Sequence, residues 1–418
     1  MSRGAPVVPR FSTAERDRRY RLARDLMDEQ GLDALFAYGE RGEAGPPQFT
    51  PDTYFTNDRP GATVIFPRRG EPVALVWSSA VIGDHLEATA RGEATWLRPS
   101  QIRTGRGADA IVRTLREEGL ERGRIGVLGL EPHPPFFPEG LIPYVTWRRV
   151  LEALPGATFV PVQRRFSELT MARSPEEVEV LRWSARAGER MCEAMVAVTR
   201  PGALESDLYA AAAAACFASV ANCYWLILLS GPGTLAWGPP AWTYRPQPPR
   251  QIREGDLVLA ELFVTAGMLE SQQQLTIAVG EVAPEAEVCA RAAREAYEVG
   301  LRELRPGARF GDVVEAMDEP VRRVGGWNLT PHLHSLNPFG AIGRCGQGFR
   351  GQPGLEAYRE VGALETTMPD LVLRPGMGFA FEPNCVLGRH RVNIGGTVVV
   401  GEDGPIEMNQ ICNRMVRV

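Results

Sequence analysis

The chain has 418 residues, a length at which two domains are the prior expectation. Its hydrophobic content of 44% and charged content of 23% are ordinary for a globular protein. A net charge of −5 without a block of basic residues argues against a nucleic-acid-binding protein, and no apolar run is long enough to cross a membrane.

The cysteines and the N-terminal stretch indicate the cellular compartment. Seven cysteines are scattered along the chain without a CxxC pair, which is typical of reduced thiols in a cytoplasmic protein. The stretch MSRGAPVVPRFSTAERD is too polar and too often broken by proline to be a signal peptide. We therefore expect a cytoplasmic protein that binds neither nucleic acid nor membranes.

The first part of the chain alternates predicted helices and strands. An amphipathic helix over residues 15–30 is stopped by Gly31, and a buried strand follows at 32–39. The pattern predicts a helix at 107–120 and further strands at 61–67, 72–77 and 124–130. This alternation predicts an α/β domain, which we place at residues 1–168.

A strong helix start marks the beginning of a second domain. Ser174 is a candidate N-cap, because a proline and two acidic residues follow it directly. The rest of this domain, residues 169–418, alternates long helices with pairs of strands, among them 256–264 and 273–280. Helices and strands are partly segregated here, which predicts an α+β domain.

One predicted strand pair of this domain carries polar residues where apolar ones are expected. In the stretch 257–280, which reads as two strands joined by a turn, Glu261 lies in the first strand, and Gln272, Gln273 and Gln274 lie in the second. Because side chains alternate along a strand, Gln272 and Gln274 share one face and Gln273 takes the other. Glu261 joins the first face if Gly267 lies in the turn. The pattern predicts the wall of a polar pocket, and a solvated edge strand is the alternative.

The motifs that follow one another along the chain resemble those of the creatinase, prolidase and aminopeptidase P family (M24), which has the pita-bread fold. The resemblance rests on SPEEVEVLR, RPGALESDL, SGPGTLAW, REGDLVLAE, LRPGMGFAFEPN and VNIGGTVVVGEDG, in this order. It implies an α/β N-terminal domain, a pita-bread catalytic domain and a homodimer that acts on a small-molecule substrate.

The resemblance also marks the positions of the family's metal ligands, most of which have changed. Two aspartates fall on Glu261 and Gln272, the metal histidine on His334, and two glutamates on Glu382 and Gly395. A dinuclear site needs several anionic oxygens to balance two dications. The changes therefore predict that no metal pair is bound, while the retained Glu261, His334 and Glu382 leave room for a single weakly held divalent ion.

Creatinase, a member of the family that works without metal, is the nearer precedent. In that comparison Gln274 and Glu382 fall on the two glutamates that hold the substrate, and the proton-transferring histidine falls on Gly238. Another family histidine falls near Ala341. If Glu261 and Glu382 face one cavity without a dication, they would recruit a cation from the ligand, such as an ammonium, amidine or guanidinium group.

Further residues complete the predicted site. His332 and His334 form an H-x-H pair, and a strand would point both rings the same way. Arg391 and Asn393 alternate with position 395 and are expected to contact the substrate, with a surface ion pair as the alternative for Arg391. Trp237, Trp242 and Tyr244 are predicted to form an aromatic lid over the site, with simple packing of the cluster as the alternative.

These observations predict a metal-independent, creatinase-like hydrolase or lyase that acts on a C–N or related bond of a small polar molecule. Glu261 and Glu382 would bind or polarise the substrate, and His334 or His332 would serve as acid and base. Gln272 and Gln274 would position the substrate. A metal-dependent Xaa-Pro aminopeptidase or dipeptidase and a non-catalytic pita-bread binding protein are the alternatives.

Overall fold

The computed structural model describes residues 7–40, 49–93, 95–132, 139–340, 343–346, 348, 354–359 and 361–418. Ala341, on which one family histidine falls, lies outside these described residues. The chain divides into two compact units. One is formed mainly by Arg10–Thr170, and the other mainly by Met171–Leu336 and Ile342–Val418.

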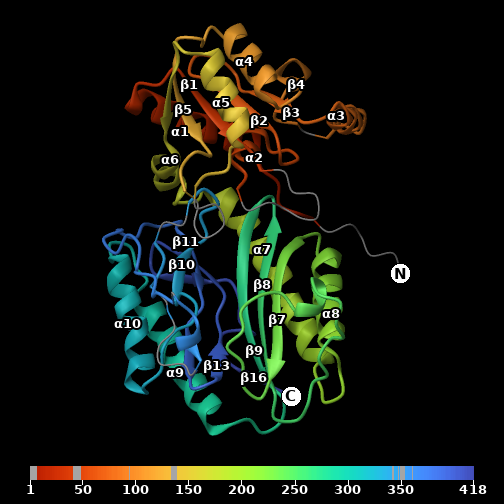
Figure 1. Ribbon diagram of the computed structural model, residues 1–418, viewed down its shortest axis with the longest axis vertical. Helices are drawn as coiled ribbons and strands as arrows, with labels where there is room; N and C mark the ends of the chain where they lie inside the picture. The colour runs from red at the N-terminus through yellow and green to blue at the C-terminus, as the bar shows by residue number, and fades with distance from the viewer. Residues whose placement is uncertain are drawn as a thin grey trace. The chain divides into compact units, whose positions relative to one another are not determined.

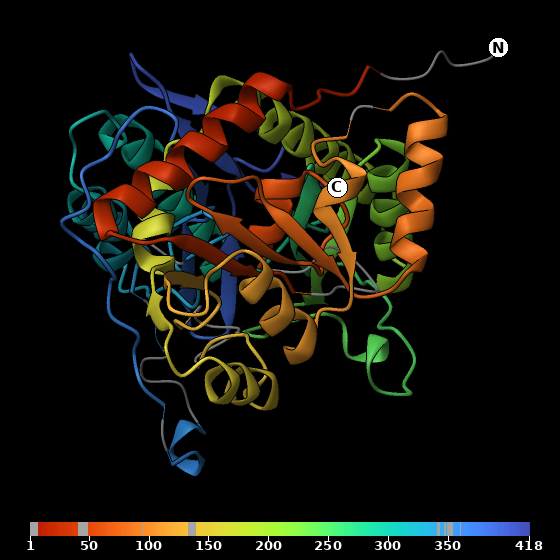
Figure 2. The ribbon, with the colours of Figure 1, turned by 90° about the horizontal axis from the view of Figure 1, so that it is seen from above.

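The N-terminal unit is a six-stranded mixed sheet with helices on both faces (Figures 1 and 2). The strand order is β4-β3-β2-β1-β5-β6, and β1 pairs antiparallel with β2 but parallel with β5. Its elements are α1 (Thr13–Gln30), β1 (Ala34–Tyr38), α2 (Pro51–Thr56), β2 (Thr63–Pro67), β3 (Val73–Val76), α3 (Ala80–Ala90), η1 (Pro99–Gln101), β4 (Ile102–Thr104), α4 (Ala108–Glu117), β5 (Arg124–Leu128), α5 (Tyr144–Ala153), β6 (Thr158–Pro161) and α6 (Gln163–Thr170).

Both faces of this sheet are buried, as the alternation of β1 shows. Leu35 and Ala37 pack into the apolar core shared with α1 and α6, whereas Ala34 and Phe36 pack with α4 and α5. Figure 2 shows α1 along one face of the sheet and α4 and α5 along the other. A strand covered on both faces reads as a continuous apolar run, which is why the sequence predicts it as buried.

The C-terminal unit places two strand layers between two pairs of helices (Figure 1). One sheet has the order β16-β9-β8-β7, another β10-β11-β14-β15, and β12 pairs with β13. The elements are α7 (Pro175–Val198), α8 (Glu205–Ala218), β7 (Asn222–Gly231), η2 (Ala241–Thr243), β8 (Leu257–Ala266), β9 (Leu269–Ala278), α9 (Pro284–Glu303), α10 (Phe310–Arg323), β10 (Leu333–Ser335), η3 (Leu355–Ala357), β11 (Gly378–Phe381), β12 (Asn384–Leu387), β13 (His390–Asn393), β14 (Thr397–Val400), β15 (Pro405–Glu407) and β16 (Val416–Arg417).

The helix start predicted at Ser174 is confirmed. The Ser174 hydroxyl accepts a hydrogen bond from the Glu177 backbone N–H at 3.1 Å. In return, the Glu177 carboxylate accepts from the Ser174 backbone N–H at 2.9 Å. This reciprocal capping satisfies backbone donors that the first turn of α7 would otherwise leave unpaired.

The hairpin formed by β8 and β9 carries the unusual polar residues. Gly267 and Met268 form its turn with φ values of 52° and 61°, the backbone of a type I′ turn. β9 lies between β8 and β16, and Gln272, Gln273 and Gln274 are 3%, 0% and 0% exposed. The alternative of a solvated edge strand is therefore wrong, and the polar side chains are inside the unit.

The two strand layers meet along the polar face of this hairpin. The Gln274 backbone N–H donates to the Gly395 carbonyl at 2.8 Å, and the Gln272 N–H donates to Thr397 Oγ1 at 3.0 Å. α7 packs against β8 and β9 from outside, and α9 packs against β12 and β13. Side chains that point inward from both layers are thus brought together between them.

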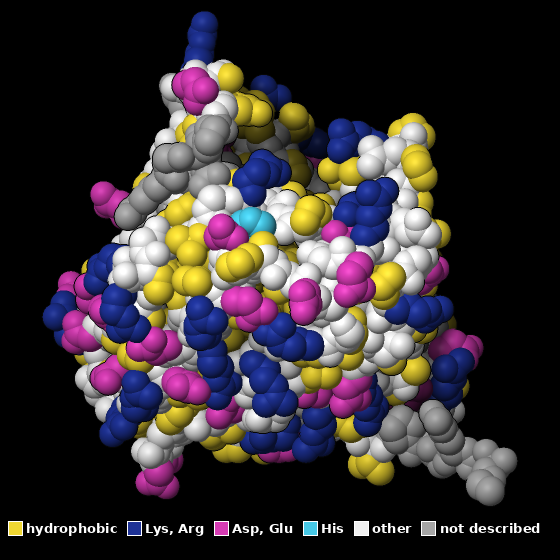
Figure 3. All heavy atoms as spheres, turned by 90° about the horizontal axis from the view of Figure 1, so that it is seen from below, with side chains coloured by type: hydrophobic (Ala, Val, Ile, Leu, Met, Phe, Trp, Pro, Cys, Tyr) yellow, Lys and Arg dark blue, Asp and Glu magenta, His cyan; other side chains and the backbone are white. Residues whose placement is uncertain are grey.

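The surface mixes charges of both signs. On the face drawn in Figure 3, acidic and basic side chains are interspersed over the coloured, described residues rather than separated into one-sign fields. Among the residues that the structure describes, no helix has the length and apolar character needed to cross a bilayer.

Candidate active site

Two buried carboxylates from different strand layers define the centre of the site. Glu261 in the middle of β8 is 4% exposed, and Glu382, directly after β11, is 2% exposed. The indole Nε1 of Trp237 donates to Glu261 Oε2 at 2.9 Å. Burial and then the negative charge of Glu382 raise the pKa of Glu261 to about 7. Such a pKa suits proton transfer near neutral pH.

His334 on β10 faces hydrogen-bond acceptors at both ring nitrogens. Its Nε2 lies 3.1 Å from Glu382 Oε1 and 3.1 Å from Gln272 Oε1, and its Nδ1 lies 3.0 Å from the Ser335 carbonyl oxygen. A carbonyl oxygen accepts but cannot donate, so both nitrogens carry protons. Burial alone would lower the pKa of His334, but the hydrogen bond and charge of Glu382 outweigh it and raise that pKa. The contacts at both ring nitrogens and the raised pKa of His334 thus both favour its imidazolium form, a proton donor.

Glu270 and Tyr224 fix the direction of the Gln272 amide, and the sequence interpretation missed both. The Glu270 carboxylate accepts from Gln272 Nε2 and from the Tyr224 hydroxyl. With its nitrogen donating to Glu270, the Gln272 amide turns its oxygen toward His334 Nε2. Glu270 precedes Gln272 by two positions on the same strand face, so the period of two could have identified it.

The predicted alternation of the three glutamines is confirmed. Gln274 lies opposite Glu261 in the strand register, and its Oε1 is 2.9 Å from Asn393 Nδ2. Gln273 points to the other face, where a Cβ on Gly188 of α7 would lie 1.8 Å from its Oε1. Gly188 is therefore the small residue that lets α7 approach β9 around this side chain.

Arg391 and Asn393 of β13 lie on the same inner face. Arg391 is 2% exposed, and its Nη2 donates to Thr330 Oγ1 at 2.8 Å. The Asn393 backbone N–H donates to Thr276 Oγ1 at 3.0 Å, which ties β13 to β9. Burial lowers the pKa of Arg391, and the carboxylates of Glu261 and Glu382 oppose that shift. The guanidinium thus belongs to the same electrostatic cluster as the two carboxylates.

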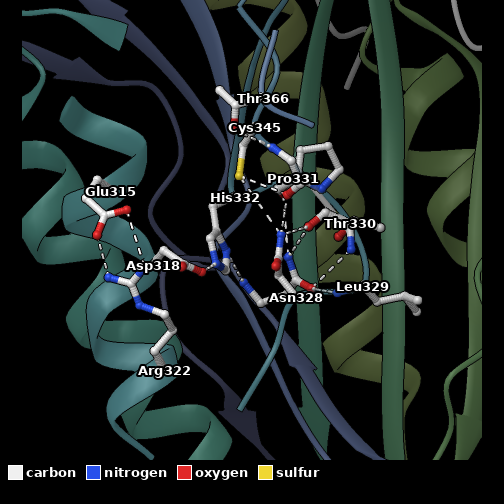
Figure 4. A network of polar contacts seen from close by, with 12 residues as sticks. Glu315, Asp318, Arg322, Asn328, Leu329, Thr330, Pro331, His332, Cys345 and Thr366 are labelled. Atoms are coloured by element: carbon white, nitrogen blue, oxygen red, sulfur yellow. Dashed lines mark hydrogen bonds and ion pairs between the residues drawn. The ribbon is translucent and has the colours of Figure 1, made fainter. Parts of the chain in front are cut away.

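The prediction that the His332 and His334 rings point the same way is wrong. The His332 ring is fully buried, with Nε2 3.4 Å from Asp318 Oδ1 of α10 (Figure 4). Its Nδ1 accepts from the Asn384 backbone N–H at 3.3 Å. β10 begins at Leu333, so His332 lies in a bend where strand alternation does not apply. His332 is placed to anchor the backbone around Glu382, whose N–H donates to the His332 carbonyl at 3.0 Å.

The three aromatic residues predicted as a lid have different surroundings. Trp242 packs edge to face against Tyr209, with the ring centroids 5.5 Å apart. Trp237 reaches Glu261, and its ring lies 4.9 Å from that of Trp225, edge to face. Tyr244 is 63% exposed, and its ring lies against the Arg245 guanidinium at 5.4 Å. The contacts of the structure therefore connect Trp237, and not Tyr244, to the carboxylates.

Comparison with known proteins identifies the family. Residues 179–402, more than half of the chain, match metallopeptidase family M24. The chain belongs to family M24. Members of this family are hydrolases, and the relatives below include a dipeptidase and creatinase.

Two curated relatives and two solved structures illustrate the likeness. The M24 chain is 28% identical over 257 residues to the probable dipeptidase PepE of Mycobacterium tuberculosis, a match over 60% of this chain and 61% of that protein. It is 22% identical over 426 residues to creatinase of a Bacillus species, covering 96% and 92%. The match thus spans less than two thirds of the length of the mycobacterial relative.

The solved structures confirm the predicted two-domain pita-bread fold. Dipeptidase PepE from Mycobacterium ulcerans has a TM-score of 0.69 at 19% identity, covering 98% of this chain and 99% of that one. X-Pro aminopeptidase from Thermotoga maritima has a TM-score of 0.70 at 16% identity, covering 96% and 99%. At these identities the likeness concerns the fold alone.

The residues present do not fit the metal pair that the family name implies. A Cβ on Gly395 would lie 2.0 Å from the Phe381 carbonyl oxygen, so that position cannot present a carboxylate without backbone movement. Both nitrogens of His334 already face acceptors, and Gln272 offers an amide oxygen that is bound to that ring. Among the described residues, no group of three or more His, Cys, Asp or Glu side chains could hold a metal ion.

The raised pKa of Glu261 predicts how stability depends on pH. Its ordinary value is 4.5 and its folded value is about 7, so the folded state binds this proton more tightly than the unfolded chain. This stabilisation is fully present below pH 4.5 and is lost as the pH rises to about 7, by at most about 1.4 kcal/mol per pH unit.

We expect Glu261→Gln, which cannot ionise, to lack this loss. Urea unfolding of the wild type and the variant across that pH window measures the difference in unfolding free energy. Parallel pH curves for the two proteins would contradict the assignment.

Proposed function

We propose that this M24 chain is a metal-independent hydrolase that cleaves a C–N or related bond of a small polar molecule. Elimination across the same bond, as in a lyase, is the alternative reaction. The observation that supports this most is the His334 ring, held as a proton donor between Glu382 and the oriented amide of Gln272. Protonating a leaving nitrogen is the step that C–N cleavage needs when no metal ion assists.

We assign complementary roles to the charged groups. His334 Nε2–H donates its proton to the leaving nitrogen, and Glu382 stabilises the imidazolium beforehand. Glu261, with a pKa of about 7, accepts the proton of the attacking water. The water oxygen bonds to the carbon as the C–N bond breaks. Glu261 gains one proton and His334 loses one, so the net change is the addition of water across the C–N bond. Gln272 and Gln274 position the substrate and the acid.

We also propose that the enzyme works as a homodimer in the cytoplasm. The homodimer follows from the family resemblance, and the compartment from the cysteine usage. All seven cysteines are free in the structure, although several lie in the same apolar cores. Sedimentation equilibrium of the full chain measures the oligomeric state, and a monomer at all concentrations would contradict the dimer.

Metal analysis tests the proposed chemistry directly. We expect the purified chain, dialysed against buffer that contains manganese, to retain no stoichiometric metal, because two ligand positions offer no anionic oxygen. Activity should be unchanged by a strong chelator. Retention of two equivalents of manganese, cobalt or zinc, together with loss of activity on chelation, would instead support a metal-dependent peptidase.

A metal-dependent Xaa-Pro dipeptidase is the second candidate, and the match to the mycobacterial dipeptidase favours it. Under this alternative, Xaa-Pro dipeptides would be cleaved only with manganese or cobalt added. Turnover of a non-peptide C–N compound in the presence of chelator decides for the metal-independent enzyme.

A further inference from the structure

Two charged side chains of the site carry buried polar atoms that have no partner. Arg391 and Glu382 are each 2% exposed, yet Arg391 Nε and Glu382 Oε2 make no hydrogen bond among the described residues. Burying a charged group whose hydrogen-bonding capacity is unmet is strongly unfavourable. Unpaired buried atoms of this kind indicate a position that another molecule completes.

Both atoms belong to the same place in the fold. Arg391 lies on β13, and Glu382 directly follows β11. The negative charges of Glu261 and Glu382 both act on the Arg391 guanidinium, which lies beside the two carboxylates. A ligand bound at Glu382 therefore also meets the guanidinium.

The two unpaired atoms, Arg391 Nε and Glu382 Oε2, require hydrogen-bonding partners of opposite kinds. Arg391 Nε is a donor only and needs an oxygen acceptor, whereas the carboxylate oxygen of Glu382 needs an N–H. A guanidinium or amidinium group offers N–H donors and no acceptor, so it satisfies Glu382 and leaves Arg391 unpaired. It would also bring a third positive charge beside Arg391 and the His334 imidazolium.

Considering the carboxylates alone, the sequence favoured a cationic ligand. The structure adds Arg391, which already supplies a buried positive charge next to both of them. A neutral planar group with one carbonyl oxygen flanked by N–H satisfies both free atoms without adding charge. Urea derivatives and carboxamides have this chemistry.

We propose that the substrate binds through a neutral carbonyl group flanked by N–H, with its oxygen at Arg391 Nε and its N–H at Glu382 Oε2. This inference rests on the proposed function, because it takes the carboxylate cluster as the substrate's site. It makes Arg391 the residue that distinguishes a urea-type group from a guanidinium-type group of the same shape.

Methylurea and methylguanidinium form the matched pair of probes, because they differ chiefly in the carbonyl oxygen and the charge. Ligand-detected NMR titration of the full chain measures the binding of each, with acetate as a third probe that has acceptors but no N–H. We expect methylurea to bind at least about tenfold more tightly than methylguanidinium, since a buried hydrogen bond to a charged group separates them. Acetate should bind more weakly than methylurea because it cannot donate to Glu382.

Arg391→Met should reduce this preference to less than about twofold, and Arg391→Lys, which keeps the charge but removes Nε, separates charge from hydrogen bonding. Equal or tighter binding of methylguanidinium to the wild type would overturn the proposal, as would failure of all three probes to bind. The wild-type comparison stands even if a variant does not fold. Because binding requires neither turnover nor metal, a urea preference in a chain without hydrolase activity would refute the proposed function alone.

Discussion

Replacing Gly395 by alanine is expected to destabilise the folded chain by at least about 3 kcal/mol. Gly395 has a φ of 119°, a backbone conformation that side chains rarely adopt. A Cβ there would also lie 2.0 Å from the Phe381 carbonyl oxygen, far closer than a Cβ atom approaches a non-bonded heavy atom. β13, β14 and β11 meet at this point, so relief of the clash would disturb hydrogen bonds between the strand layers.

Gly404→Ala is the matched control for this substitution. Gly404 also has a positive φ, 148°, but a Cβ there meets nothing within 4 Å. Urea unfolding of the two variants therefore separates backbone strain from steric clash. We expect a much larger loss of unfolding free energy for Gly395→Ala, and equal losses would contradict the close approach. The same clash predicts that Gly395→Glu cannot restore a metal pair, because the chain would have to move before a carboxylate fitted.

Glu382→Gln is expected to lower the rate of hydrolysis by about 10²- to 10⁴-fold, the usual range for loss of acid–base function. The substitution keeps the size of the side chain but removes the charge that holds His334 as an imidazolium. The pKa of His334 would then fall, so the proton donor would be deprotonated over more of the neutral pH range. Steady-state kinetics on a C–N compound that the wild type turns over measures the effect.

Glu402→Gln serves as the control for this loss. Glu402 is exposed in the turn between β14 and β15. These two strands belong to a different sheet from the β8–β9 hairpin. The control should retain the wild-type rate. If Glu382→Gln also retains it, the carboxylate has no part in the reaction, and a non-catalytic binding protein becomes the better account.

The sequence by itself determined the order of domains and much of the local structure. The Ser174 cap, the β8–β9 turn at Gly267 and the separation of Gln273 from its neighbours all follow from rules that act within a few residues. The motifs also identified Glu261, His334 and Glu382 as a group, since each lies at a fixed place in the family pattern.

Only the tertiary structure decided how these groups are used. The orientation of Gln272 depends on Tyr224 and Glu270, and its contact with His334 joins residues 62 positions apart. The His332 ring points toward Asp318 instead of sharing the direction of the His334 ring, because β10 begins only at Leu333. Whether Arg391 Nε finds a partner depends on the segments that pack around β13. Local patterns fix which face a side chain takes, because the backbone repeats over a few residues. The proton and charge partners of that side chain are set by segments that meet only when the layers pack.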